Sequence, residues 1–264
     1  MQKYLQALVA FLSFAIAQGQ TNIYHPFPDT DAVWTVHDGY AGSAFYCPNG
    51  ISEWDRSYIQ KGDTVINNTQ YNKLYLNEHH WEYWLNPSCF FDYGTTTNVF
   101  VGGLRNDSAN KKVYYFDNYS NQDCLLYDFS LNVGDSIREW WSNCSNIGYY
   151  YKILSVDSVL VGMQYHKRFN IAGGYNADTS IIEGVGSLTG LLGYYFFFEN
   201  FNQLHCFSEL NQVMYVNTNC FCPCTVVGIN EIKNNFSFTI LPNPFYTSTT
   251  LHTNTILKNA QVII

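Results

Sequence analysis

Two stretches of this chain are so alike that they constrain its fold more than any other feature. Residues 63–75 read DTVINNTQYNKLY, residues 157–169 read DSVLVGMQYHKRF, and the two align without a gap. Each combines a β-branched run, a turn at 67–68 or 161–162 and an aromatic return segment, which is the pattern of a β-hairpin. KVYYF at 112–116 and QVMYV at 212–216 form a second, weaker pair. The repetition predicts an antiparallel β meander that is used twice.

Composition agrees with an all-β fold around a packed core. Hydrophobic residues make up 47% of the 264-residue chain, and its 22 Tyr and 19 Phe favour strands over helices. Helical periodicity with caps at both ends is absent from the sequence. Candidate strands recur about every ten residues, as a sandwich or barrel requires. The sequence therefore predicts an antiparallel β-barrel or β-sandwich built from the duplicated meander.

The two ends of the chain predict export. Residues 1–17 combine a positive charge at Lys3, an apolar run and an Ala-Ile-Ala site, which is the organisation of a secretory signal peptide. We expect an all-β body over 18–224 and a linker over 225–237. A new β pattern over 238–264 stops inside a strand, so we expect the natural chain to continue. The body contains no segment apolar for long enough to span a membrane.

The C-terminal pattern consists of ILPNPF at 240–245, TTL at 249–251 and LKNA at 257–260. It resembles the type A sorting domain of type IX secretion substrates in Gram-negative bacteria, with Pro242, Asn243, Pro244 and Phe245 as the sorting signal. In that family the domain is a small β-sandwich that directs passage through the outer membrane. The resemblance implies an extracellular or surface protein that passes the periplasm and contacts the type IX machinery. The body, particularly IEGVGSLTGLL at 182–192, resembles uncharacterised secreted bodies found upstream of such domains, and no activity follows from that.

Charge and cysteine content narrow the function further. The net charge of −8, from 13 Lys and Arg against 21 Asp and Glu, disfavours nucleic acid and anionic membranes as partners. An even number of cysteines in an exported chain indicates disulfides. The candidates are Cys47, Cys89, Cys124, Cys144, Cys206, Cys220, Cys222 and Cys224. The alternating spacing over 220–224 differs from that of zinc sites, so disulfides are favoured there over a metal.

Catalytic motifs are weak in this sequence. EHHWE at 78–82 and His166 are the best metal or acid–base candidates, but His79 and His80 face opposite sides of a strand and cannot share an ion. The sequence has neither HExxH nor GxSxG, although Ser187 lies among glycines. Asp178 and Glu183 could serve as the acid and base of a glycosidase. We therefore expect no metal or cofactor, and we keep a secreted hydrolase acting on glycans as the alternative function.

The repeat itself offers a candidate binding surface. Tyr71 with Lys73, and Tyr165 with Lys167, share one face of each return strand. The other face of the second copy is polar at 166, 168 and 170, so we expect the aromatic face to turn inward in both copies. The lysines then either line a polar cleft for an anionic or sugar ligand, or lie at the sheet margin with their ammonium groups in solvent. The second interpretation is favoured, because lysine is rarely buried without a partner.

Tryptophans offer the other candidate surface. Trp81, Trp84, Trp140 and Trp141 either stack on sugar rings or pack within the core. The sequence therefore predicts a secreted, non-catalytic binding or structural protein, with a glycan or another surface ligand as its partner. A binding protein should present an exposed aromatic patch, whereas an enzyme should bring two carboxylates, or a histidine and a carboxylate, together in a cavity.

Overall fold

The structure is a computed structural model that describes residues 23–42, 44–85, 88–138, 144, 150–172, 180–193, 200–217, 238–241 and 250–253. Its strands all pair in antiparallel fashion within these residues, which confirms the predicted all-β antiparallel class. The chain divides into two compact units, Met1–Val226 and Val227–Ile264. In the described part, no helix has the length and apolar character needed to cross a membrane.

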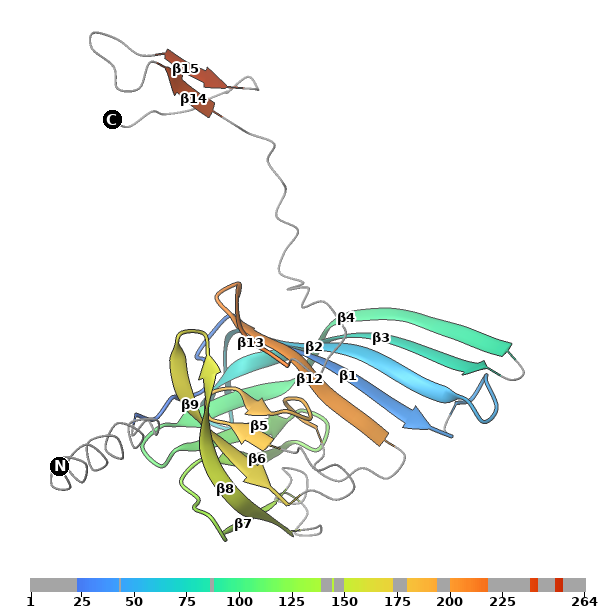
Figure 1. Cartoon of the computed structure of the whole chain (residues 1–264), viewed down its shortest axis with the longest axis horizontal. Helices are drawn as coiled ribbons and strands as arrows, with labels where there is room; N and C mark the ends of the chain where they lie inside the picture. The colour runs from blue at the N-terminus through green and yellow to red at the C-terminus, as the bar shows by residue number, and fades with distance from the viewer. Residues whose placement is uncertain are drawn as a thin grey trace, which may run out of the picture. The chain divides into compact units, whose positions relative to one another are not determined.

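The first unit contains two sheets (Figure 1). The eight-stranded sheet has the order β13-β12-β1-β2-β3-β4-β5-β6. Its strands are β1 (Ala32–Ala41), β2 (Ile51–Ile66), β3 (Thr69–Leu85), β4 (Ser88–Asp107), β5 (Lys112–Asp117), β6 (Gln122–Asp128), β12 (Asn200–Glu209) and β13 (Gln212–Val216). The curled five-stranded sheet comprises β7 (Ser136–Arg138), β8 (Tyr150–Val161), β9 (Gln164–Ile171), β10 (Ser180–Ile182) and β11 (Gly186–Ser187). In the second unit, β14 (Phe238–Leu241) pairs with β15 (Thr250–Thr253).

Both predicted hairpins form, but their turns differ. Asn67 and Asn68 connect β2 to β3 with φ of 50° and 62°, the left-handed pair that a tight hairpin turn requires and that Asn tolerates. In the β8–β9 hairpin Val161 still pairs with Gln164, so the turn lies one residue later than predicted, beginning at Gly162. The two copies therefore have different registers: Tyr71 is paired with Thr64, whereas the equivalent Tyr165 is paired with Leu160.

The prediction that the aromatic face points inward in both copies is wrong. In the first copy the fully buried core residue is Leu74, which alternates with Lys73 and lies on the opposite face from Tyr71. Tyr71 is buried instead on the outer side of the sheet, against the Phe116 ring. In the second copy Phe169 does enter the core.

The remaining residues of the second hairpin also depart from the predicted pattern. Tyr165 is 56% exposed, although its face was expected to turn inward. His166, which was expected in water, is buried: its ring stacks on His25 and its Nδ1 lies 2.8 Å from the Glu183 carbonyl oxygen. A backbone acceptor and a neighbouring ring thus replace water around the imidazole, so burial leaves it partnered.

One hydrophobic core lies between the two sheets. It is formed by side chains such as Trp34 and Leu104 from the eight-stranded sheet and Ile153 and Ile181 from the five-stranded one. The glycine-rich segment at 182–192 runs through this space. Trp34 Nε1 donates to the Val185 carbonyl at 2.6 Å, and Tyr127 Oη donates to the Leu191 carbonyl at 2.5 Å. These bonds satisfy backbone oxygens that the core would otherwise leave without partners.

Glycine is required in this segment because the backbone approaches its neighbours closely. At Gly190, with φ of 105°, an added Cβ would lie 2.8 Å from Val36. At Gly186, with φ of 104°, it would lie 3.0 Å from the Tyr127 oxygen. A side chain at either position would therefore clash with the core.

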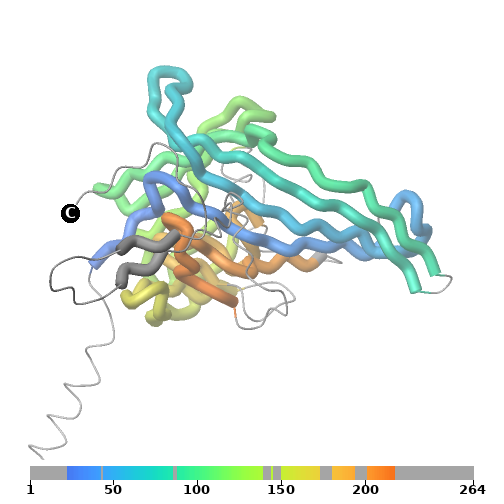
Figure 2. Tube along the Cα trace, turned by 90° about the horizontal axis from the view of Figure 1, so that it is seen from above, coloured from blue at the N-terminus to red at the C-terminus, as the bar shows by residue number. Residues whose placement is uncertain are grey.

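The distal halves of β1 to β4 extend beyond the core and form a ribbon that we call the arm, comprising residues 37–41, 51–56, 77–85 and 88–98 (Figures 1 and 2). Over 88–101, β4 pairs only with β3 within the described chain, so it is an edge strand. Register shifts interrupt this edge, and Gly94 and Asn98 adopt positive φ there. Such bulges hinder further strand addition, so the faces of the arm are better placed than its edge to bind a partner.

Candidate functional site

The arm presents two faces of different chemistry, because successive strand residues point to opposite sides. We call the face that continues the core the inner face and the opposite one the outer face. On β3 the inner face carries His80 and Glu82, and the outer face carries His79 and Trp81.

Three rings from three strands form a stacked row on the inner face. Trp54 and His80 are cross-strand partners whose ring centroids lie 4.5 Å apart, and those of His80 and Tyr93 lie 4.0 Å apart. The planes are within 11° of parallel, so the ring faces cover one another. The Arg56 guanidinium lies over the Trp54 ring, 5.1 Å from its centroid. The row therefore presents the edges of its rings to solvent. Tyr93, at the outer end of the row, is 41% exposed.

His80 is held neutral within this row. Burial lowers its pKa, because the charged imidazolium loses hydration between two rings. Its Nε2 atom is shielded from solvent and makes no hydrogen bond within the described chain. The row is thus an uncharged aromatic surface at neutral pH.

A buried carboxylate organises the tip of the arm. Glu82, which is 2% exposed, accepts hydrogen bonds from the backbone N–H groups of Phe45 at 2.8 Å, Tyr46 at 2.8 Å and Cys47 at 3.2 Å. It also accepts one from Tyr93 Oη at 2.7 Å. Burial favours the protonated acid, but these bonds outweigh it and the pKa of Glu82 is lowered.

The same tip is fixed covalently and exposes aromatic side chains. The Cys47–Cys89 disulfide joins the β1–β2 loop to β4. Phe45 is 80% exposed and Tyr46 51% exposed, and Tyr46 stacks on Phe91 with centroids 4.0 Å apart. Exposed apolar groups on a rigid support are a common property of interaction surfaces.

An ion-pair network lies beside the row, toward the core. Arg56 Nε contacts the Glu78 carboxylate at 2.6 Å, and its Nη1 contacts the carboxylate of Asp38. Burial raises the pKa of Asp38 even though Arg56 opposes the shift. The group carries two carboxylates for one guanidinium, so its formal charge is not positive.

A cavity of about 170 Å³ adjoins this network. Its lining residues are Val36, Asp38, Arg56, Tyr58, Gly190, Leu192, Gly193 and Asn202. The cavity lies where the arm leaves the core and the glycine-rich segment approaches β1. Its wall combines hydrogen-bonding side chains with apolar ones, as small-molecule sites do.

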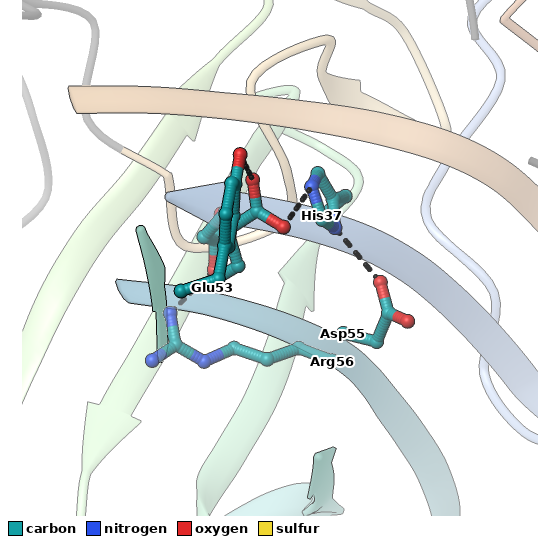
Figure 3. Close-up of polar contacts among 6 residues, drawn as sticks. His37, Glu53, Asp55 and Arg56 are labelled. Atoms are coloured by element: carbon teal, nitrogen blue, oxygen red, sulfur yellow. Dashed lines mark hydrogen bonds and ion pairs between the residues drawn. The ribbon is translucent and has the colours of Figure 1, made fainter. Parts of the chain in front are cut away.

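The outer face carries a histidine between two carboxylates (Figure 3). His37 Nδ1 lies 2.8 Å from the Asp55 carboxylate and Nε2 lies 3.9 Å from that of Glu53. The hydrogen bond to Asp55 raises the pKa of His37, and the same bond lowers the pKa of Asp55. Tyr83 Oη donates to Glu53 at 3.2 Å. None of these residues lines the cavity of the inner face.

A second histidine–carboxylate pair lies nearby. His79 Nε2 is 3.0 Å from the Asp92 carboxylate, and the Trp81 ring lies between the two histidines, 5.1 Å from His79 and 5.9 Å from His37. No group of three or more His, Cys, Asp or Glu side chains in the described residues is arranged to hold a metal ion. The placement of His79 and His80 on opposite faces is confirmed by their separate partners.

The predicted ligand residues are distributed over both sheets. Lys73 is in β3 of the eight-stranded sheet and Lys167 in β9 of the five-stranded one. Trp81 and Trp84 are on opposite faces of β3. Trp140 and Trp141 lie outside the described residues.

The cysteine prediction is confirmed for the described part of the chain. Besides Cys47–Cys89, a second disulfide joins Cys124 to Cys144, and Cys206 is also disulfide-bonded. Cys220, Cys222 and Cys224 lie outside the described residues, as do Pro242, Asn243, Pro244 and Phe245.

The environment of Glu183 does not support its predicted role in an acid–base pair with Asp178. Glu183 is fully buried, and desolvation raises its pKa, whereas Asp178 lies outside the described residues. Ser187 is buried and bonded to Thr189. Both described side chains are therefore part of the core and closed to a polymeric substrate.

Several inner-face residues were not identified from the sequence. Trp54, Arg56 and Tyr93 become neighbours of His80 and Glu82 only through the β2–β3–β4 register. One signal was present: SEWDRSY at 52–58 alternates, and its residues 54, 56 and 58 form one strand face.

Comparison with known proteins gives no relative: no family model, no curated protein sequence and no solved structure matches this chain.

Proposed function

We propose that this chain is an exported, non-catalytic binding protein whose arm binds a glycan on its inner face. The observation that carries the proposal is the stacked row of Trp54, His80 and Tyr93, which lies outside the core and next to hydrogen-bonding groups. Aromatic groups with polar edges next to planar polar side chains suit carbohydrates, whose rings have both apolar C–H faces and hydroxyls.

Rigidity supports this assignment. The rings support one another across strands, and Glu82 and the Cys47–Cys89 disulfide fix the tip. A surface that is ordered before binding loses little conformational entropy when the ligand arrives. The net charge of −8 favours a neutral glycan over an anionic one.

The alternative, a secreted glycan hydrolase, has one observation in its favour: His37 lies between Asp55 and Glu53. These groups lie on the outer face of the sheet, where Asp55 is 54% exposed, and a hydrolase generally encloses its acid and base. Release of reducing sugar by the purified protein, lost in Glu53→Gln, would favour the hydrolase.

We also propose export by type IX secretion, with the β14–β15 hairpin as the start of a small sandwich-like sorting domain. The disulfides support an oxidising compartment. The β2–β3 and β8–β9 hairpins are proposed to derive from one duplicated meander, on the strength of the aligned sequences at 63–75 and 157–169.

Affinity electrophoresis tests the binding proposal. The protein is run through native gels containing glucomannan, xyloglucan or laminarin, with alginate as the anionic comparison. We expect retardation by at least one neutral polymer, reduced in Trp54→Ala and Tyr46→Ala. Tyr119→Ala is the matched control, because Tyr119 is 99% exposed and lies on the turn after β5, which is not part of the arm. Unchanged mobility of the folded protein in all neutral gels would reject the proposal.

A further inference from the structure

We propose that the cavity at the base of the arm binds one neutral sugar unit of the ligand. The inference rests on the proposed function and adds which part of the glycan is recognised, a single uncharged sugar ring. It is carried by the juxtaposition of Asp38, Arg56 and Asn202 around a single concavity, whose Arg56 also lies over the Trp54 ring of the aromatic row.

The size of the cavity limits what enters it. Its volume of about 170 Å³ corresponds to about five or six water molecules at about 30 Å³ each. Sites for drug-sized ligands occupy about 300–1,000 Å³. The cavity therefore accommodates one sugar ring and leaves the rest of an oligosaccharide to the surface of the arm.

The polar groups of the wall match hydroxyls. Asp38 supplies acceptor oxygens, Arg56 supplies donors, and the Asn202 amide and Tyr58 hydroxyl supply both. Asp38 and Asn202 are cross-strand partners of β1 and β12, so their side chains share the inner face. Neighbouring hydroxyls of a sugar each donate and accept, which is what such a mixed wall requires.

The charge of the wall selects neutral sugars. Arg56 is already paired with Asp38 and Glu78, so an incoming carboxylate or sulfate meets a guanidinium whose charge is compensated and a surplus carboxylate. Val36 and Leu192 provide the apolar part of the wall, against which the C–H groups of a ring can pack. Uronic acids and sulfated sugars are therefore disfavoured.

Direct titration of the full chain with methyl glycosides tests this inference without a polysaccharide. Methyl glycosides of glucose, mannose, galactose and N-acetylglucosamine are added to isotopically labelled protein, with glucuronate as the anionic comparison. We expect at least one neutral glycoside to shift the amide resonances of residues 36–38, 190–193 and 202 in a saturable way. Glucuronate should leave them unchanged.

A pair of adjacent variants distinguishes the site from general effects. Asn202→Ala removes a wall group, whereas Gln203→Ala alters the next residue of β12, which is paired with His37 and points to the outer face. We expect Asn202→Ala to bind the glycoside at least tenfold more weakly than the natural protein. Gln203→Ala should bind it with unchanged affinity. Equal affinity in the two folded variants, or no shift at the cavity with any neutral glycoside, would overturn the inference.

The two proposals can fail separately. Retardation by a neutral polysaccharide that is insensitive to Asn202→Ala, without cavity shifts, supports the binding function and rejects the cavity. Cavity shifts sensitive to Asn202→Ala, without retardation by any polymer, support the cavity and reject polymer binding by the arm.

Discussion

Replacing Glu82 by glutamine should loosen the tip of the arm while leaving the side-chain volume almost unchanged. The carboxylate uses one oxygen for the N–H of Phe45 and the Tyr93 hydroxyl, and the other for the N–H groups of Tyr46 and Cys47. Glutamine keeps one acceptor oxygen and puts an NH₂ donor in place of the other. With the NH₂ group in the Oε1 position the Phe45 N–H faces another donor, whereas the Tyr93 and Ser52 hydroxyls on this side can turn to accept. In the other orientation the N–H groups of Tyr46 and Cys47 both lose their acceptor.

The magnitude follows from these lost bonds. Hydrogen bonds to a charged group contribute about 1.5–3 kcal/mol each, so the loss of one or two of them amounts to about 1.5–6 kcal/mol. Tyr46 is half exposed and its N–H can turn to water once the loop moves. We therefore expect Glu82→Gln to lower the free energy of unfolding by about 2–4 kcal/mol.

Urea denaturation and amide hydrogen exchange measure this effect. The exchange of the amides of residues 45–47 should accelerate more than that of the core strands. Glu209→Gln is the control, because burial raises the pKa of Glu209 and its folded environment does not favour the charged form. Unchanged stability and unchanged exchange at 45–47 in Glu82→Gln would refute the assigned role of the carboxylate.

The pH dependence of amide exchange gives an independent test of the role of Glu82. Because the pKa of Glu82 is lowered in the folded state from 4.5, its contribution is complete above that value and is lost as pH falls through the lower folded pKa. The protection factors at 45–47, which correct for the intrinsic pH dependence of amide exchange, should therefore fall in acid in the natural protein. In Glu82→Gln they should be low at every pH.

Three further changes test other parts of the fold. Glu183→Gln should stabilise the protein at pH 8 and not at pH 4. The pKa of Glu183 is raised in the folded state, so the natural protein loses stability as the pH rises. Thermal unfolding at both pH values checks this, and a larger gain at pH 4 would contradict it. Trp34→Phe removes the bond to the Val185 carbonyl and should cost about 1–3 kcal/mol in urea denaturation; a cost near zero would indicate that water replaces the indole. Joint replacement of Cys47 and Cys89 by serine opens a loop with a sequence separation of 42 and should cost about 4 kcal/mol in urea denaturation without reductant; an unchanged midpoint would contradict a stabilising role of this disulfide.

Local signals in the sequence were sufficient for the two hairpins and for the turn of the first, whereas the turn of the second lies one residue later than predicted. Asn67 and Asn68 indicate a left-handed turn because their side chains tolerate positive φ, and the hairpin follows there. The cysteines indicated disulfides from their number and context.

Features that depend on register could not be read in the same way. Trp54 meets His80 only because β2 and β3 pair in one particular register, and Tyr93 reaches the row because a bulge occurs in β4. The same limit explains the error over the aromatic face: the local pattern at His166 suggested solvent, whereas His25 and the Glu183 carbonyl provide buried partners from distant parts of the chain. Burial is decided by such partners, and alternation alone does not identify them.

Hydrogen exchange of the disulfide-intact protein, with and without a retarding neutral polysaccharide, tests the binding role of the arm most directly. Saturating polysaccharide should slow exchange across residues 45–58 and 77–93, with little change in β7 to β10. Protection confined to the five-stranded sheet, or to the turn around Tyr119, would contradict the assignment of the ligand to the arm.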